Sequence, residues 1–196
     1  MFRILSLALL GWLLAACQTY QFKGTEYPDP QPAPEFELVD TQGQPFRLSD
    51  RRGQVVLLFF GYTHCPDVCP ITLGEARQII SDLGDDAGQV DFTFITVDPE
   101  RDTPEVLDRY VSNFHPDIVG LSGDVDDLAA VRQAYGIFAE KEDLAHEHTH
   151  EDEAGDYLVG HTSRVFLVDP QGRLRLSYAF GTPAADITQD IRHLLK

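Results

Sequence analysis

The sequence predicts an α/β protein, in which helices cover both faces of a central mixed sheet to form a three-layer α/β/α sandwich. Apolar runs typical of strands alternate with amphipathic helical segments through the middle of the chain, and a strand hairpin and a helix follow. The run from Val55 to Phe60 is apolar without a break, which is typical of a central strand covered on both faces. With 196 residues, the chain is long enough for one domain with a full hydrophobic core.

Hydrophobic periodicity and turn residues predict the individual elements. Thr103 and Pro104 predict a helix start with an N-cap and a first-turn proline, and Gly136 is expected to end a later helix. The acidic segment from Glu140 to Asp156 is expected to be a surface loop. We expect strands over 36–39, 46–48, 55–60, 90–97, 118–121, 164–168 and 173–180, and helices over 71–83, 104–114, 125–135 and 184–195.

The first 17 residues are expected to act as an export signal rather than to join the domain. Arg3 precedes an apolar run from Ile4 to Leu14, which is too short to span a membrane comfortably as a mature helix. The run ends in Leu-Ala-Ala before Cys17, which resembles a bacterial lipoprotein signal and implies lipidation of Cys17. An ordinary signal peptide and an uncleaved anchor are the alternatives. All three place the domain outside the cytoplasm, facing the periplasm or extracytoplasmic space.

Residues 18–34 are polar and carry alternate prolines, at Pro28, Pro30, Pro32 and Pro34. Alternate prolines favour an extended polyproline-like chain, so this segment is predicted to be a semi-stiff tether. The folded domain is accordingly expected to cover residues 35–196.

The charge balance is strongly acidic. Lys and Arg total 15 and Asp and Glu total 32, giving a net charge of −17. This excess argues against nucleic acid as a partner and against adhesion of the globular surface to an anionic bilayer. It is compatible with a basic protein partner or with capture of cations.

With Cys17 assigned to lipid, the domain keeps two cysteines, Cys65 and Cys69, between a predicted strand and a predicted helix. Residues four apart lie on one side of a helical turn, and unsatisfied N–H groups at a helix start lower a thiol pKa. Two thiolates are soft donors that favour Cu(I) or zinc over hard ions, but a dithiol can also be oxidised. Both chemistries stay open. A dithiol directly after a central strand also fits a thioredoxin-like arrangement.

Three segments resemble the signatures of the Sco/SenC family of copper proteins. They are Phe60 to Pro70 (FGYTHCPDVCP), Val97 to Pro104 (VDPERDTP) and Asp156 to His161 (DYLVGH). The resemblance implies that Cys65, Cys69 and His161 bind one copper ion, as Cu(I) or Cu(II). It also implies an exported, membrane-anchored, thioredoxin-like protein that assists assembly of the copper A centre in subunit II of cytochrome c oxidase.

Several further residues are candidates for supporting roles. His64 and Asp98 could lie next to the metal ligands, although a packed His64 and a capping Asp98 explain the sequence as well. Gly160 departs from the family pattern, because many members have an acidic residue before the histidine. An alternating set in the acidic segment could form an auxiliary metal arm or simply a solvated loop: His146, His148 and His150.

The leading functional prediction is a copper metallochaperone, and the alternative is a thiol–disulfide oxidoreductase that reduces a recipient's cysteines. Against a general oxidoreductase, three residues separate the cysteines where thioredoxin has two, and the segment from Gly160 to Arg164 lacks the expected proline. A peroxidase is disfavoured because Tyr62 and Pro66 stand where peroxiredoxins have a threonine three residues before the reactive cysteine. Whether the protein is an enzyme therefore stays open.

Overall fold

The structure is a computed structural model that describes residues 20–143 and 157–196. The predicted lipidation site at Cys17 and the histidines of the acidic segment (His146, His148 and His150) lie outside the described residues. Within the described ranges, no helix combines the length and apolarity needed to cross a bilayer.

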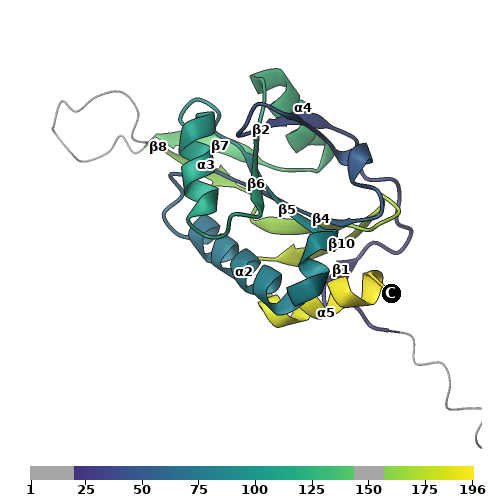
Figure 1. Cartoon of the computed structure of the whole chain (residues 1–196). Helices are drawn as coiled ribbons and strands as arrows, with labels where there is room; N and C mark the ends of the chain where they lie inside the picture. Colours follow the sequence, from purple (N-terminus) through teal and green to yellow (C-terminus); the bar gives the residue numbers. More distant parts are fainter. Residues whose placement is uncertain (1–19, 144–156) are drawn as a thin grey trace, which may run out of the picture.

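In the part of the chain that the structure describes, eight strands form one mixed sheet, in the order β1-β10-β9-β4-β5-β6-β2-β3 (Figure 1). The strands β4, β5 and β6 run parallel, whereas β9 runs antiparallel to β4 and β2 runs antiparallel to β6. The bounds are β1 Thr25–Glu26, β2 Glu37–Asp40, β3 Pro45–Arg47, β4 Val55–Gly61, β5 Val90–Thr96, β6 Ile118–Ser122, β9 Arg164–Val168 and β10 Leu174–Ala179.

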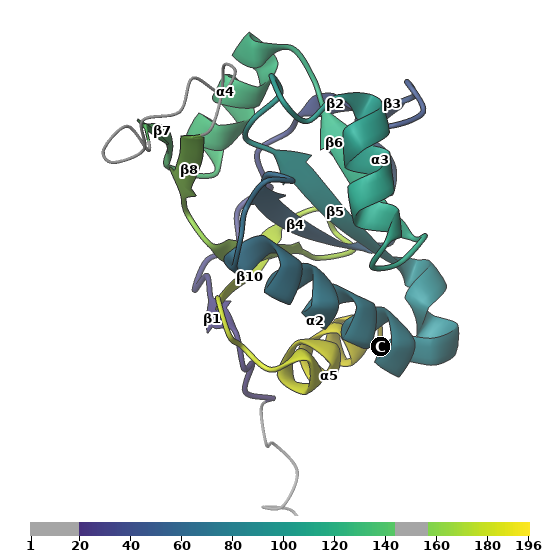
Figure 2. The ribbon, with the colours of Figure 1, turned by 90° about the vertical axis from the view of Figure 1, so that its left-hand side faces the viewer.

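Helices cover both faces of this sheet, which confirms the predicted α/β sandwich (Figures 1 and 2). On one face, α2 (Val68–Leu83), α3 (Pro104–Ser112) and α5 (Ala184–Leu194) bury their apolar sides, and on the other face α4 (Val125–Ala134) does so. All seven residues of β4 are buried, as expected for a central strand. Two short 3₁₀ helices, η1 (Leu48–Arg51) and η2 (Gly84–Gln89), complete the connections.

The helix signals predicted at Thr103 and Gly136 take part in the structure as expected. The Thr103 side chain accepts a hydrogen bond from the backbone N–H of Val106 at the start of α3. Gly136 has a φ of 65°, the left-handed conformation that suits glycine after a helix. Asp124 is the residue before α4, but its side chain makes no capping hydrogen bond.

The segment from Tyr20 to Pro34 packs on the domain, so the prediction of an extended tether is wrong over these residues. Its strand β1 pairs with β10 through Thr25 and Ser177, and the backbone N–H groups of Lys23 and Gly24 donate to the buried carboxylate of Asp190. A buried carboxylate requires donors, and pairing with β1 covers an otherwise exposed edge of the sheet. Both effects depend on residues more than 140 positions away in the chain.

The prediction of a surface loop over 140–156 is also wrong at its start. Strand β7 (Ala139–Asp143) pairs with β8 (Tyr157–His161) as a separate two-stranded antiparallel hairpin. Charged residues in β7 concealed the strand, because they give no alternation of apolar and polar residues. The hairpin places His161 at the end of β8, beside its partner residue Ala139.

Candidate metal centre

The dithiol lies at the edge of the sheet where the parallel strands end. After β4 ends at Gly61, a turn carries Cys65, and α2 then begins with Cys69 as its second residue. Pro70 follows within the first helical turn, where its missing N–H breaks no intrahelical hydrogen bond. Cys65 thus lies between the strand and the helix, as expected, whereas Cys69 already belongs to the helix, which begins three residues earlier than the predicted range of 71–83.

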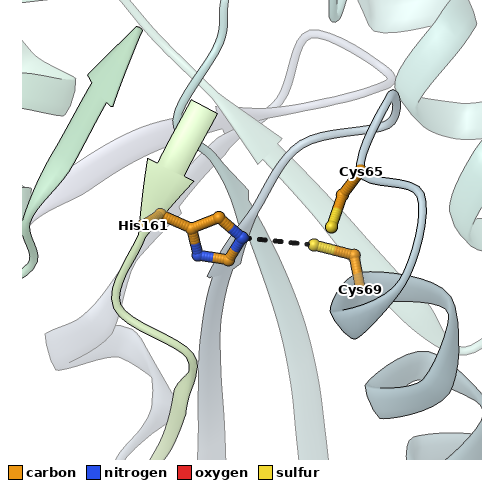
Figure 3. A group of neighbouring side chains, drawn as sticks. All are labelled: Cys65, Cys69 and His161. Carbon is orange, nitrogen blue, oxygen red and sulfur yellow. Dashed lines mark hydrogen bonds between the residues drawn. The ribbon is translucent and has the colours of Figure 1, made fainter. Parts of the chain in front are cut away.

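His161 reaches this dithiol from the β7–β8 hairpin. Figure 3 shows its imidazole pointing at the two sulfur atoms. The Nε2 atom lies 3.5 Å from Sγ of Cys69. The donor atoms of Cys65, Cys69 and His161 all lie within 4.8 Å of one another. The other ring nitrogen, Nδ1, lies 3.2 Å from the carbonyl oxygen of Thr162. The structure therefore brings together the three residues that the family resemblance singles out.

The two thiols have very different acidities. The pKa of Cys65 is lowered to about 3, chiefly by a hydrogen bond from the Cys69 thiol and also by one with His161, while burial opposes the shift. The pKa of Cys69 is raised, first because of this hydrogen bond with Cys65 and then because of burial. The pair thus holds one proton and one negative charge at neutral pH. Both are free cysteines, and Cys69 is fully buried while Cys65 is partly exposed.

A buried carboxylate holds the turn that carries Cys65. The Asp102 side chain is inaccessible to solvent and accepts hydrogen bonds at 2.6 Å from the hydroxyls of Thr63 and Thr96. It also accepts from the backbone N–H of Thr63 at 3.2 Å. Burial raises the pKa of Asp102, and the two threonine hydroxyls oppose that shift. This role of Asp102 was not predicted from the sequence. An aspartate shortly after a parallel strand does indicate a residue that serves a site at that end of the sheet.

The two candidate supporting residues have other contacts. His64 is about half exposed, and its Nδ1 lies 3.0 Å from the Thr63 hydroxyl. The oxygen atoms of Asp98 accept hydrogen bonds from Arg101 Nε at 2.5 Å and from the Tyr157 hydroxyl at 2.6 Å. Neither side chain is hydrogen-bonded to His161, whose ring nitrogens face Cys69 and a carbonyl group.

The fold and this site define a thioredoxin-like domain in which two cysteines and a distant histidine could form a site for a soft metal ion. The chain belongs to the SCO1/SenC family, whose model matches residues 25–196.

Relatives and solved structures agree with this assignment. The mitochondrial protein SCO2 homolog of Bos taurus is 38% identical over 160 residues, which cover 81% of this chain and 58% of that protein. The first curated relatives are thus matched over 58% to 60% of their own length. A Rickettsia prowazekii SCO2-like protein is 34% identical over 79% of this chain and 72% of its own.

Two solved structures are similar across almost their whole chains. Bradyrhizobium japonicum ScoI with copper bound is 36% identical, with a TM-score of 0.73 over 84% of this chain and 99% of that one. Apo Sco1 from Thermus thermophilus is 39% identical, with a TM-score of 0.73 over 90% of this chain and 97% of that one. The thioredoxin-like fold expected from the sequence is therefore confirmed.

Proposed function

We propose that this chain is a copper metallochaperone that carries one copper ion on Cys65, Cys69 and His161 and delivers it to the copper A centre in subunit II of cytochrome c oxidase. The observation that carries the proposal is the convergence of the three donor atoms within 4.8 Å. The copper-bound state of the similar Bradyrhizobium japonicum protein supports the choice of metal.

The donor set suits a carrier of copper in both oxidation states. Two sulfur donors bind soft Cu(I), and an imidazole nitrogen adds a donor that Cu(II) favours. Because Cys69 is buried while Cys65 and His161 are partly exposed, an incoming ligand has access to the ion from the exposed side. Binding as a dithiolate releases the proton that the thiols share, so copper affinity should increase with pH.

The same proposal includes the place of action. Export and lipidation at Cys17 would tether the domain to a bacterial membrane on its extracytoplasmic side, where a membrane-bound oxidase presents its copper site. The lipoprotein-like sequence before Cys17 supports this part. Mass spectrometry of the membrane fraction tests it: diacylglyceryl-modified Cys17 is expected, and an unmodified N-terminus would contradict it.

Copper titration of the reduced mature chain tests the site. One equivalent of Cu(II) should give a thiolate charge-transfer band and a single paramagnetic resonance signal. His161→Ala should abolish or strongly shift both while leaving the circular dichroism of the fold unchanged. His115→Ala, a matched control in the connection between α3 and β6, should behave as the wild type. Unchanged copper spectra in the His161 variant would contradict the three-donor site.

A thiol–disulfide oxidoreductase is the second candidate, because the pKa of Cys65 is lowered to about 3 and a thiolate is the nucleophile of disulfide exchange. In that reaction Cys65 and Cys69 would form a disulfide, and their two electrons would reduce a disulfide of the recipient. Mixing the copper-loaded chain with an apo fragment of subunit II separates the two functions. Copper transfer that leaves Cys65 and Cys69 reduced supports the carrier, whereas oxidation of Cys65 and Cys69 with matching reduction of the recipient, and without copper transfer, supports the reductase.

A further inference from the structure

The position of His161 depends on how the β7–β8 hairpin is attached to the rest of the domain. The hairpin forms its own two-stranded sheet and shares no strand pairing with the central sheet. The two thiols, in contrast, are fixed by the end of β4 and the start of α2. The distance between His161 and the thiols therefore depends on the short connection from His161 to β9, on the ring contacts of His161 with Phe59 and Tyr62, and on the contacts that hold the rest of the hairpin against the domain.

Tyr157, the first residue of β8, is held through its ring, its carbonyl and its hydroxyl. The guanidinium carbon of Arg101 lies 3.5 Å from the centre of the Tyr157 ring, and Arg101 Nη1 donates to the Tyr157 carbonyl at 2.9 Å. The Tyr157 hydroxyl donates to Asp98 at 2.6 Å, and the other oxygen of Asp98 accepts from Arg101 Nε at 2.5 Å. These three residues form a closed set of contacts, which we call the hairpin clamp.

The two charged members of the hairpin clamp are shielded from solvent and Tyr157 is partly buried, which makes their interactions stronger than those of a surface pair. The Asp98 side chain is 0% exposed and that of Arg101 is 17% exposed. A cation over an aromatic ring gains more when both groups are desolvated. The neighbouring pair of Lys141 and Glu100 is 49% and 64% exposed, so it should contribute little.

Packing beneath the hairpin is incomplete. A cavity of about 220 Å³ lies there, lined by Val97, Val125, Leu128, Arg132, Ala139 and Val159 among others. The Val159 side chain packs in the core, and its backbone N–H donates to the Tyr62 hydroxyl at 3.1 Å. Tyr62 belongs to the turn that carries Cys65. The strand β8 is thus tied at Tyr157 and Val159, and His161 lies about 13 Å along it from the clamp.

We propose that Arg101 and Tyr157 are positioning residues that hold the hairpin so that the His161 imidazole stays within reach of the two thiols. They touch neither sulfur atom nor the imidazole in the contacts described above, and act through the strand that carries His161. Cu(II) binding needs the imidazole, so it should depend on the clamp, whereas Cu(I) held by two thiolates should be nearly independent of it. This inference rests on the proposed copper site.

Arg101→Met is the first test, because methionine removes the charge and keeps much of the side-chain length. We expect Cu(II) affinity to fall about tenfold or more, and Cu(I) affinity to change less than about threefold. In the apo protein, amide hydrogen exchange should accelerate at Val159 and His161 but not in β4. Arg109→Met, at an exposed position of α3, is the matched control and should change none of these quantities.

A second pair of variants keeps the test decisive. Tyr157→Phe removes only the hydrogen bond to Asp98 and should give a smaller change of the same sign, even if Arg101→Met fails to fold. In a His161→Ala background, Arg101→Met should not lower the residual Cu(II) affinity further, because there is no imidazole to position.

The outcomes separate the clamp from the copper site. Unchanged Cu(II) affinity and hydrogen exchange in Arg101→Met, or an additive effect of Arg101→Met in the His161→Ala background, would overturn the clamp while leaving the proposed carrier intact. Equal losses of Cu(I) and Cu(II) affinity would also overturn it, because they would show damage to the dithiol. Failure of the wild-type chain to bind copper would instead overturn the proposed function.

Discussion

Replacing Gly61 with alanine is expected to disturb the dithiol directly. Gly61 is the last residue of β4, and a Cβ there would lie 2.7 Å from Sγ of Cys69 and 2.8 Å from a ring carbon of Phe94. Ordinary contacts begin at 3.4 Å, and both neighbours are fully buried. The sulfur and the ring must therefore move, at a cost typical of an overpacked core, about 1–3 kcal/mol.

Thermal unfolding of the reduced apo chain measures this cost. For a domain of this size, each kcal/mol changes the Tm by about 2–4 °C, so Gly61→Ala should lower the Tm by about 2–12 °C. Because Cys69 Sγ is displaced, the affinities for Cu(I) and Cu(II) should both fall.

Gly74→Ala is the matched control for this variant. Gly74 lies in α2, where a Cβ would meet nothing within 4 Å, so the same substitution should stabilise the helix by about 0.5–1 kcal/mol. Copper binding should then stay as in the wild type. A Gly61→Ala chain that is as stable as the wild type, with an unchanged copper spectrum, would refute the packing argument around Cys69.

Three further predictions concern other parts of the chain. Asp190→Ala should cost at least about 2 kcal/mol and expose residues 20–24 to limited proteolysis, because backbone N–H groups lose a buried acceptor; an equally resistant variant would contradict this. Thr103→Ala should lower the free energy of unfolding in urea by about 1 kcal/mol without changing copper affinity, and a neutral result would argue against its capping role. The pKa of Cys65 is lowered to about 3, chiefly by the hydrogen bond from Cys69, so its thiolate contributes stability that is fully present above the usual thiol pKa and is lost progressively as the pH falls from there to about 3. Alkylation of Cys65 by iodoacetamide should therefore stay nearly constant from pH 8 to about 5, whereas an ordinary thiol would lose about tenfold per pH unit.

Local signals in the sequence were sufficient for most of the central sheet and its helices. The unbroken apolar run of β4 predicted a strand buried on both faces, and Thr103 and Gly136 predicted a helix start and a helix end that the structure confirms. Such signals are reliable because they depend on neighbouring residues: burial of one strand, one capping hydrogen bond, one left-handed backbone position.

Two elements failed to follow from local signals because distant residues stabilise them. The strand β1 depends on the open edge of β10 and on the buried carboxylate of Asp190, neither of which a proline-rich sequence around Pro30 reveals. The strand β7 is rich in charged residues, and its pairing with β8 gives it a structure that its composition does not predict.

The sequence by itself determined the class of fold, the position of Cys65 and Cys69 after a central strand, and, through its resemblance to one family, the choice of His161 as third donor. Only the tertiary structure decided how these groups meet. A hairpin outside the central sheet carries His161 to within 3.5 Å of Cys69, and the Tyr157 contacts that support it come from the loop after β5. The physical reason is that a metal site of this kind depends on distances between separate elements, and the number of residues between the ligands does not determine those distances.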